Sequence, residues 1–477
     1  MGVLDSTEHV DGFTDIFNFA HFVFRVDSLS VTRSAQLARE LALLADILMR
    51  LRPAPPLTSH AFRSMTNGTV RRLMSTQIRA DLASFLGGRS RSCGIVGMPN
   101  VGKSTLFNAL TNTQAAQAAN YPFCTIEPNV GRVAIPDARL EALARLAGSA
   151  KVIGAQLEFV DIAGLVKGAS EGAGLGNKFL GNIRQVSMIL MLLRCFDDTD
   201  KDIITHVDGS VDPVRDLETI ETELLLADIQ TLTRRLGAGK NERKTVAAWS
   251  MASEVALVER ILGVLDQGMP ARELMLSEEE ALIFRHLQLL TGKPLLVACN
   301  VPESQVQGND HTRAVAEFLS TREQASEAKK AGGLGAESSH VAAISVSCRL
   351  EEEVSMVADD VETRDNILRE YGLQETGLNQ VIHASNQMLA LSTFYTVGPQ
   401  EARAWPFAQG IAAPKAAGLI HSDFERGFIK AETISFQDFV AYGGEAEARE
   451  AGKLRLEGKD YVPQDGDIFH FKFNTTT

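Results

Sequence analysis

The chain has 477 residues, 45% hydrophobic and 22% charged, with a formal net charge of −13 at pH 7. This balance is typical of a globular protein and excludes a mainly disordered or fibrous chain, and the length predicts roughly three domains. The acidic balance excludes a general binder of DNA or other nucleic acid, so any RNA contact must be local. The longest apolar run, around Met188–Leu193, is about ten residues, whereas a membrane-spanning helix needs roughly 20, so it predicts a buried strand and no membrane segment.

The five cysteines are scattered along the chain, odd in number and without C-x-x-C spacing. They predict neither a disulfide framework nor a zinc site, and they favour a reducing compartment. They are Cys93, Cys124, Cys195, Cys299 and Cys348.

Residues 1–91 form an N-terminal extension with an uneven charge. Residues 50–91 include eight arginines, no lysine and one acid, a composition typical of an organellar transit segment. Residues 1–49 carry seven acids against three arginines, which is unusual for an import signal unless translation begins at Met65 or Met74. The extension therefore favours a mitochondrial or plastid location over the cytoplasm. A surface extension that carries no targeting signal is the alternative.

From Ser92 to about Ile204, short apolar runs alternate with glycine-rich loops, which predicts an α/β domain. From about 212 to 291, leucine and isoleucine recur at three- and four-residue spacing, which predicts a helical hairpin. Strand-like runs return at Pro294–Cys299 and Val341–Ser347. The helical hairpin is therefore expected to be an insertion within the α/β domain.

The last segment, from about Leu391 to Asn474, has short Thr, Phe, Ile and Val runs separated by Gly, Pro and Asp. This texture predicts a small, separate β-rich domain. Within it, Lys453, Arg455 and Lys459 alternate along an expected strand, which would place three positive charges on one face for phosphate binding. A plain solvated strand face is the alternative.

A phosphate-binding loop is the strongest motif. Residues Gly97 to Ser104 (GMPNVGKS) fit G-x-x-x-x-G-K-[ST], immediately after an apolar strand and before a helical segment. Phosphate binding needs backbone N–H groups at a helix N-terminus, glycines that let the backbone approach, and a lysine, here Lys103, that neutralises the phosphate oxygens. The Ser104 hydroxyl is then expected to ligate Mg²⁺.

A second signature is the apolar strand that ends in Asp161-Ile162-Ala163-Gly164, a D-x-x-G motif. In a P-loop protein this motif places an acid beside Mg²⁺ and a glycine N–H beside the γ-phosphate, so the loop senses which nucleotide is bound. Between the two motifs, Thr125 is placed to give Mg²⁺ a second hydroxyl when the triphosphate is present.

Five segments together resemble the Obg-like ATPase family, called YchF in bacteria. They are Gly97–Thr105, Tyr121–Val130, Asp161–Leu180 (DIAGLVKGASEGAGLGNKFL), Asn300–Glu303, and Ala404–Phe473 with HSDFERGFIKAE and GKLRLEGKDYVPQDGD. The resemblance extends over about four fifths of the chain and leaves out the N-terminal extension.

The resemblance implies an α/β fold with three parts. Residues 92–390 would form an OBG-type, Ras-like P-loop domain with the helical, coiled-coil insertion at about 212–291. Residues 391–474 would form a TGS domain, a small β-grasp module. It also implies a ribosomal partner, with the large subunit the expected site.

The base-reading loop has Asn300-Val301-Pro302-Glu303 where GTPases have N-K-x-D. The lysine stem that covers the base is replaced by Val301, and Glu303 is one methylene longer than the aspartate that pairs with guanine. A hydrogen-bonding site altered in this way is expected to lose guanine preference. By resemblance, adenine is held by Asn300 and the backbone around Val301, and ATP is preferred over GTP. A degraded GTPase loop with little base preference is the alternative.

The group that activates water is not identified by the sequence. Ras-like proteins have a glutamine after D-x-x-G, but Leu165 stands here. A histidine that is a candidate in family members aligns with Met191, so turnover is expected to be slow. Asn100 occupies the position at which some P-loop switches hold K⁺, and a role in shaping the loop only is the alternative.

The sequence therefore predicts an ATP-binding, slowly hydrolysing molecular switch that associates with the ribosome. A GTPase of the Obg class and a nucleotide-binding ribosome or RNA scaffold with negligible hydrolysis are the alternatives. The residues expected to contact the nucleotide are Gly97, Asn100, Val101, Gly102, Lys103, Ser104, Thr105, Asp161, Gly164, Asn300, Val301 and Glu303.

Overall fold

The computed structural model describes residues 91–118, 129–162, 175–197, 210–242, 248–330, 343–357 and 360–474, which belong to one compact unit spanning residues 72–477. The inferences about an import signal and about Thr125, Gly164 and Leu165 concern positions outside the described residues.

The first sheet has six strands in the order β2-β4-β1-β5-β6-β7, and all neighbours are parallel except the antiparallel pair of β2 and β4. The strands are β1 Ser92–Val96, β2 Val130–Ala134, β4 Gln156–Asp161, β5 Met188–Arg194, β6 Leu295–Asn300 and β7 Ala343–Val346. Every residue of β1, β5 and β6 is buried, as is typical of parallel strands covered on both faces. The apolar run around Met188 is thus a buried strand, as predicted.

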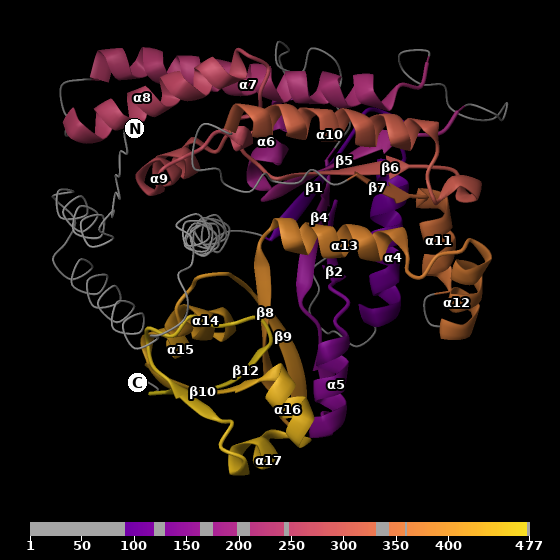
Figure 1. Cartoon of the computed structure of the whole chain (residues 1–477), viewed down its shortest axis with the longest axis vertical. Helices are drawn as coiled ribbons and strands as arrows, with labels where there is room; N and C mark the ends of the chain where they lie inside the picture. The colour runs from indigo at the N-terminus through magenta and orange to yellow at the C-terminus, as the bar shows by residue number, and fades with distance from the viewer. Residues whose placement is uncertain are drawn as a thin grey trace, which may run out of the picture. The chain divides into compact units, whose positions relative to one another are not determined.

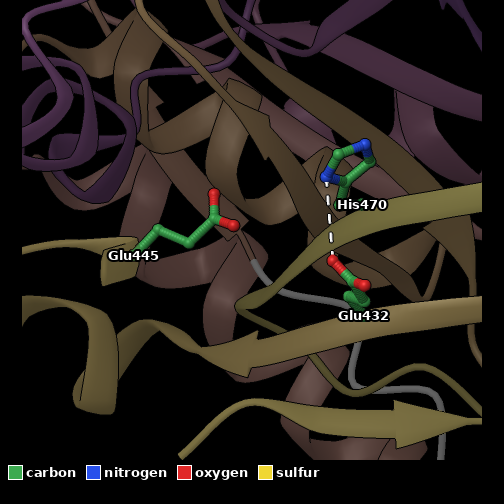
Figure 2. A group of neighbouring side chains, drawn as sticks. All are labelled: Glu432, Glu445 and His470. Atoms are coloured by element: carbon green, nitrogen blue, oxygen red, sulfur yellow. Dashed lines mark ion pairs between the residues drawn. The ribbon is translucent and has the colours of Figure 1, made fainter. Parts of the chain in front are cut away.

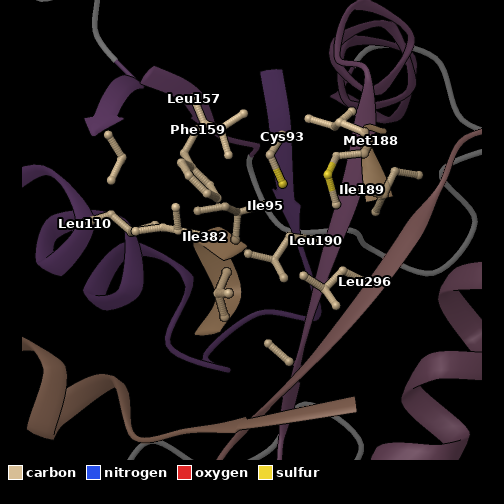
Figure 3. Packing of buried hydrophobic residues seen from close by; sticks show 14 of the residues in the cluster. Cys93, Ile95, Leu110, Leu157, Phe159, Met188, Ile189, Leu190, Leu296 and Ile382 are labelled. Carbon is tan, nitrogen blue, oxygen red and sulfur yellow. The ribbon is translucent and has the colours of Figure 1, made fainter. Parts of the chain in front are cut away.

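Helices connect and cover these strands (Figure 1). They are α4 Lys103–Ala118, α5 Ala138–Ala147, α6 Leu175–Gln185, α10 Asp310–Lys330, α11 Cys348–Met356, α12 Val361–Glu370 and α13 Gly377–Met388. Side chains of β1, β4 and β5 meet those of α4 and α13 in one hydrophobic core, part of which is drawn in Figure 3. This core holds the first turn of α4, and with it the phosphate loop, against the carboxyl ends of the parallel strands.

The helical insertion lies between β5 and β6 and contains α7 Pro213–Glu242, α8 Ala248–Leu265, a 3₁₀ turn η1 at Ala271–Glu273, and α9 Glu278–Leu287. Helices α7 and α8 run alongside each other and share a second core with α9 (Figure 1). The buried carboxylate of Glu221 on α7 pairs with Arg272 and with Arg322 on α10, so the base of the insertion is tied to the α/β domain.

The C-terminal residues, together with β3, form a second six-stranded sheet in the order β11-β10-β12-β8-β9-β3. Its strands are β3 Lys151–Ile153, β8 Leu391–Val397, β9 Glu401–Ala408, β10 Phe428–Ser435, β11 Arg455–Glu457 and β12 Asp467–Phe473. Helices α14 Ala413–Ile420, α15 Ser422–Arg426, α16 Phe436–Tyr442 and α17 Glu445–Glu450 accompany them. An aromatic core centres on Phe394, which meets Phe407, Phe469 and Phe471.

The predicted fold class, an α/β P-loop domain with a helical insertion and a C-terminal β domain, is confirmed. Strand β3 departs from that division, because it comes from the α/β part of the chain and pairs in parallel with β9. Among the described residues, none of the helices is both long and apolar enough to span a bilayer.

Candidate nucleotide-binding site

The phosphate loop connects the end of β1 to the start of α4, and two of its glycines are required by close contacts. Gly102 has φ +100°, and a Cβ there would lie 2.5 Å from Asn300 Nδ2. A Cβ on Gly97 would lie 2.5 Å from the Leu192 carbonyl oxygen of β5. Asn100 also has a positive φ, 65°, a conformation in which asparagine is enriched, and its side chain is exposed.

Lys103 is buried at the first turn of α4, and its Nζ lies within the loop. It donates to the carbonyl oxygens of Gly97, at 3.1 Å, and Met98, at 2.7 Å. Burial lowers the pKa of this ammonium, and the nearby Asp161 carboxylate partly opposes that effect. The lysine ammonium is therefore placed inside the loop, where a bound phosphate group would supply a negative charge to pair with it.

Ser104 and Asp161 meet at the entrance of the loop. The Ser104 hydroxyl donates to Asp161 Oδ2 at 3.4 Å, and Asp161 lies at the carboxyl end of β4, paired in register with Ile95 of β1. A hydroxyl and a carboxylate are oxygen ligands of the kind that Mg²⁺ takes, with waters and phosphate oxygens completing an octahedron. This pair fits a magnesium ion, while Thr125 and Gly164, expected beside it, lie outside the described residues.

Asn300, at the end of β6, joins the phosphate loop to the base-reading loops. Its side-chain Nδ2 donates to the Val101 carbonyl at 2.9 Å, and its Oδ1 accepts from the Cys348 backbone N–H at 3.0 Å. One amide hydrogen and one acceptor lone pair remain on the side chain for a base. The sequence had linked Asn300 only to the base, so its contact with Val101 is a structural finding.

The next residues separate into a buried and an accessible position. Val301 is 2% exposed and belongs to the main core, and its N–H donates to the Val346 carbonyl at 2.9 Å. It therefore does not lie over a base as a lysine stem would. Glu303 begins a 3₁₀ turn, η2 Glu303–Gln305, and its Oε1 lies 3.1 Å from Nε of Arg349 in the first turn of α11. Sequence analysis missed this ion pair, because nothing in either loop alone indicates it.

Met191, which aligns with a catalytic candidate, is completely buried in β5. It pairs in register with Val96 of β1 and Val297 of β6, in the middle of the parallel sheet. A side chain at this depth does not contact water at the loop entrance. Its burial argues against a direct role for this position in hydrolysis.

The prediction that Lys453, Arg455 and Lys459 lie on one strand of the C-terminal domain is wrong. Only Arg455 lies on a strand, β11, and it pairs with Asp467 and Glu457. Lys453 precedes the strand and pairs with Asp438, and Lys459 follows it in a turn. Neighbouring carboxylates therefore neutralise two of the three positive charges that would have to face a phosphate backbone.

Glu432, Glu445 and His470 form the group that most resembles a metal site among the described residues (Figure 2). Glu432 of β10 is opposite His470 of β12, but its Oε2 also lies 3.4 Å from the Arg449 guanidinium and 3.5 Å from the Lys472 ammonium. These cations already balance the carboxylates, so the cluster is an exposed ion-pair network.

Two family models match the chain. Residues 92–226 match one described as a 50S ribosome-binding GTPase, and residues 391–474 match the YchF-GTPase C-terminal model, described as a protein of unknown function (DUF933).

Named relatives extend these matches over most of the chain. The ribosome-binding ATPase YchF of Bacillus subtilis (strain 168) is 46% identical over 386 residues, 80% of this chain and 99% of that protein. Its namesake in Escherichia coli O157:H7 is 46% identical over 382 residues, with the same coverage. The solved structure of the Schizosaccharomyces pombe YchF GTPase has a TM-score of 0.70 at 34% identity and covers 81% of this chain and 98% of that one. Relatives this similar, matched almost from end to end, show that the chain belongs to the YchF family.

Proposed function

We propose that this protein binds ATP with Mg²⁺, hydrolyses it slowly and acts as a nucleotide-dependent switch on the ribosome. The observation that carries the choice of ATP is the base-reading loop, in which Val301 is buried and the carboxylate of Glu303 pairs with Arg349. Neither group is thus disposed as the lysine and aspartate of a guanine site. The bacterial relatives are named ATPases, in agreement with this choice.

A GTPase of the Obg class is the second candidate. It is favoured by one specific observation: the similar solved protein from Schizosaccharomyces pombe is named a GTPase. A scaffold that binds nucleotide without hydrolysing it is the third, because Met191, which aligns with a catalytic candidate, is completely buried.

The contributions proposed for the phosphate site are supported by the geometry of its described residues and, for Thr125, by the sequence alone. Lys103 neutralises phosphate oxygens, and Ser104 and Asp161 hold Mg²⁺, with Thr125 joining them when the triphosphate is bound. Backbone N–H groups from Gly97 to Thr105 surround the phosphates at the N-terminus of α4. Positioning and charge stabilisation of this kind sustain slow phosphoryl transfer. The exposed Asn100 is proposed to help hold K⁺ beside the phosphates.

The proposed partner is the ribosome, at its large subunit. The names of the bacterial relatives support a ribosomal partner, and the description '50S ribosome-binding GTPase' for residues 92–226 supports the large subunit. A mitochondrial or plastid location is a separate proposal that rests on the arginine-rich residues 50–91. N-terminal sequencing of the mature protein tests it, since a mature chain that begins near Met1 and fractionates with cytosol would end it.

Equilibrium titration with ATP and GTP analogues in the presence of Mg²⁺ tests the nucleotide assignment. ATP is expected to bind more tightly than GTP. Lys103→Ala is expected to lower the affinity for both nucleotides by roughly 10- to 100-fold, because a charge-assisted contact with the phosphates is lost. Equal affinities in the parent protein would contradict the choice of ATP. Turnover assays with and without ribosomes and K⁺ then separate a switch from a scaffold, since a scaffold gives no hydrolysis under any condition.

A further inference from the structure

The two loops that flank the base region are held in a fixed relation by buried hydrogen bonds. Asn300 accepts from the Cys348 N–H, and the Val301 N–H donates to the Val346 carbonyl. The side chain of Ser347 caps α11 by accepting from the Leu350 N–H at 3.5 Å. The backbones of the residues that follow, Glu303 on one loop and Arg349 on the other, are therefore positioned by their own well-packed neighbours.

Glu303 and Arg349 meet across the gap between these loops. Glu303 Oε1 lies 3.1 Å from Arg349 Nε, and the side chains are 28% and 87% exposed. The carboxylate is the only acid in the N-x-x-E segment and the one that stands nearest to the position of a guanine-reading aspartate. Its Oε1 and its charge are engaged by a guanidinium, which presents donors only.

Guanine recognition requires a free carboxylate, because the ring N–H and the amino group of guanine are both donors. An adenine has no ring N–H at that position and makes no such demand. From the ion pair, and resting on the ATP assignment above, we propose that Arg349 is a specificity-determining residue. By holding the Glu303 carboxylate, it removes the acceptor that would otherwise favour a guanine nucleotide.

The expected size of the effect follows from the exposure of the pair. Exposed ion pairs are weak, so Arg349 holds the carboxylate by no more than about a fivefold bias. The bulk of the adenine preference is assigned to the missing lysine and the altered loop, and Arg349 adds a measurable increment. Because the Arg349 side chain is on the surface, its removal leaves the core intact.

The test is a double-mutant cycle in the full-length protein with AMP-PNP and GMP-PNP as probes. Arg349→Ala is expected to narrow the ratio of the two dissociation constants by about two- to fivefold in favour of the guanine nucleotide. Arg349→Lys retains a cation and is expected to keep the parent ratio. In the Glu303→Gln background, Arg349→Ala is expected to change the ratio by less than about twofold, because the carboxylate is already absent.

Arg235→Ala is the matched control. It removes another exposed ion pair, to Glu254 at 2.7 Å in the helical insertion, and is expected to leave the ratio unchanged. An unchanged ratio in Arg349→Ala would overturn the proposal, as would a gain for guanine that persists in Arg349→Ala/Glu303→Gln.

Failure of the ATP assignment gives a different result. If the parent protein shows no preference while Arg349→Ala still improves GMP-PNP binding, the role of Arg349 stands and the ATP assignment falls. If the parent prefers AMP-PNP and Arg349→Ala matches it, only the role of Arg349 falls.

Discussion

Asn300 shows how one residue links the two halves of the nucleotide site. Its amide connects the phosphate loop, through Val101, with the loop before α11, through Cys348. Gly102 has no side chain at the point where a Cβ would collide with that amide. Asn300 therefore joins the phosphate loop to the base-reading loops by direct contacts that do not involve the rest of the sheet.

Met191→His is expected to destabilise the protein by about 1 to 3 kcal/mol and to leave turnover no faster than in the parent. The position is completely buried between Val96 and Val297, so an imidazole there would be desolvated among apolar groups. Urea unfolding and single-turnover ATP hydrolysis measure the two effects. The alignment with a histidine by itself would predict a gain in rate, and the burial of this position argues against it.

Met191→Leu is the control for the Met191→His experiment, because a volume-conserving apolar change costs less than about 1.5 kcal/mol. A histidine variant that is both as stable as the parent and faster would restore a catalytic role to this position.

At the scale of elements, α11 is joined to α13 by a buried acid. Glu351, 2% exposed, accepts the Gly377 N–H at 2.7 Å at the start of α13, and its Oε2 has no hydrogen-bond partner among the described residues. A helix N-terminus favours the charged carboxylate, but burial is the larger effect and raises the pKa of Glu351 to about 7. Because α11 also carries Cys348 and Arg349, this contact supports the base-reading loop.

Glu351→Gln is expected to flatten the pH dependence of stability between about pH 4.5 and pH 7. In the parent the folded state binds the proton more tightly than the unfolded state, so the free energy of unfolding falls as pH rises through this window. For a pKa that rises from 4.5 to about 7 the loss is roughly 3 to 4 kcal/mol, and it is complete above the folded-state pKa. Urea unfolding at about pH 5 and about pH 8 measures it.

Glu353→Gln serves as the control for Glu351→Gln, since Glu353 is an exposed acid on the same helix. A parent-like pH profile in Glu351→Gln would show that another group produces the dependence.

In the molecule as a whole, the C-terminal sheet is attached to the segment between the phosphate loop and the D-x-x-G motif. Strand β3, which pairs with β9, comes after β2 and before β4 in the sequence. Strands β2 and β4 are antiparallel partners in the first sheet, and β4 ends at Asp161. Beside it, Asp137 caps α5 and accepts from the Tyr395 hydroxyl of β8, while Arg139 Nη1 lies 2.7 Å from Asp465 Oδ2. The α/β and C-terminal parts thus share one sheet and one polar network.

Arg139→Ala is expected to lower the stability of the C-terminal domain by about 1 kcal/mol, because it removes a partly exposed ion-pair network. The measurement is hydrogen exchange at the backbone amides of β3 and β9, which should become faster while those of β5 and β6 stay protected.

Arg132→Ala provides the comparison for Arg139→Ala. It removes an exposed pair with Glu158 inside the first sheet and is expected to leave exchange at β9 unchanged. If exchange at β3 and β9 is as slow in Arg139→Ala as in the parent protein, the three-residue pairing of β3 with β9 is sufficient to hold the two parts together.

Features that depend on consecutive residues were predictable from the sequence. The phosphate loop from Gly97 to Ser104 was predictable because a strand, a glycine turn and a helix start are local, and the buried strand at Met188–Arg194 because a parallel strand is apolar throughout. The helical insertion was visible for the same reason, through its repeated leucines. Motif resemblance located Asn300 and Glu303.

Contacts between residues that are distant in the sequence could be found only in the folded chain. The contact of Asn300 with Val101, the ion pair of Glu303 with Arg349 and the pairing of β3 with β9 join residues from different elements, and no local pattern encodes them. The same reason explains the error at Lys453 and Arg455, whose charges are balanced by Asp438 and Asp467. Hydrophobic periodicity specifies which face of an element is buried, whereas the partner of each polar group depends on how the whole chain packs.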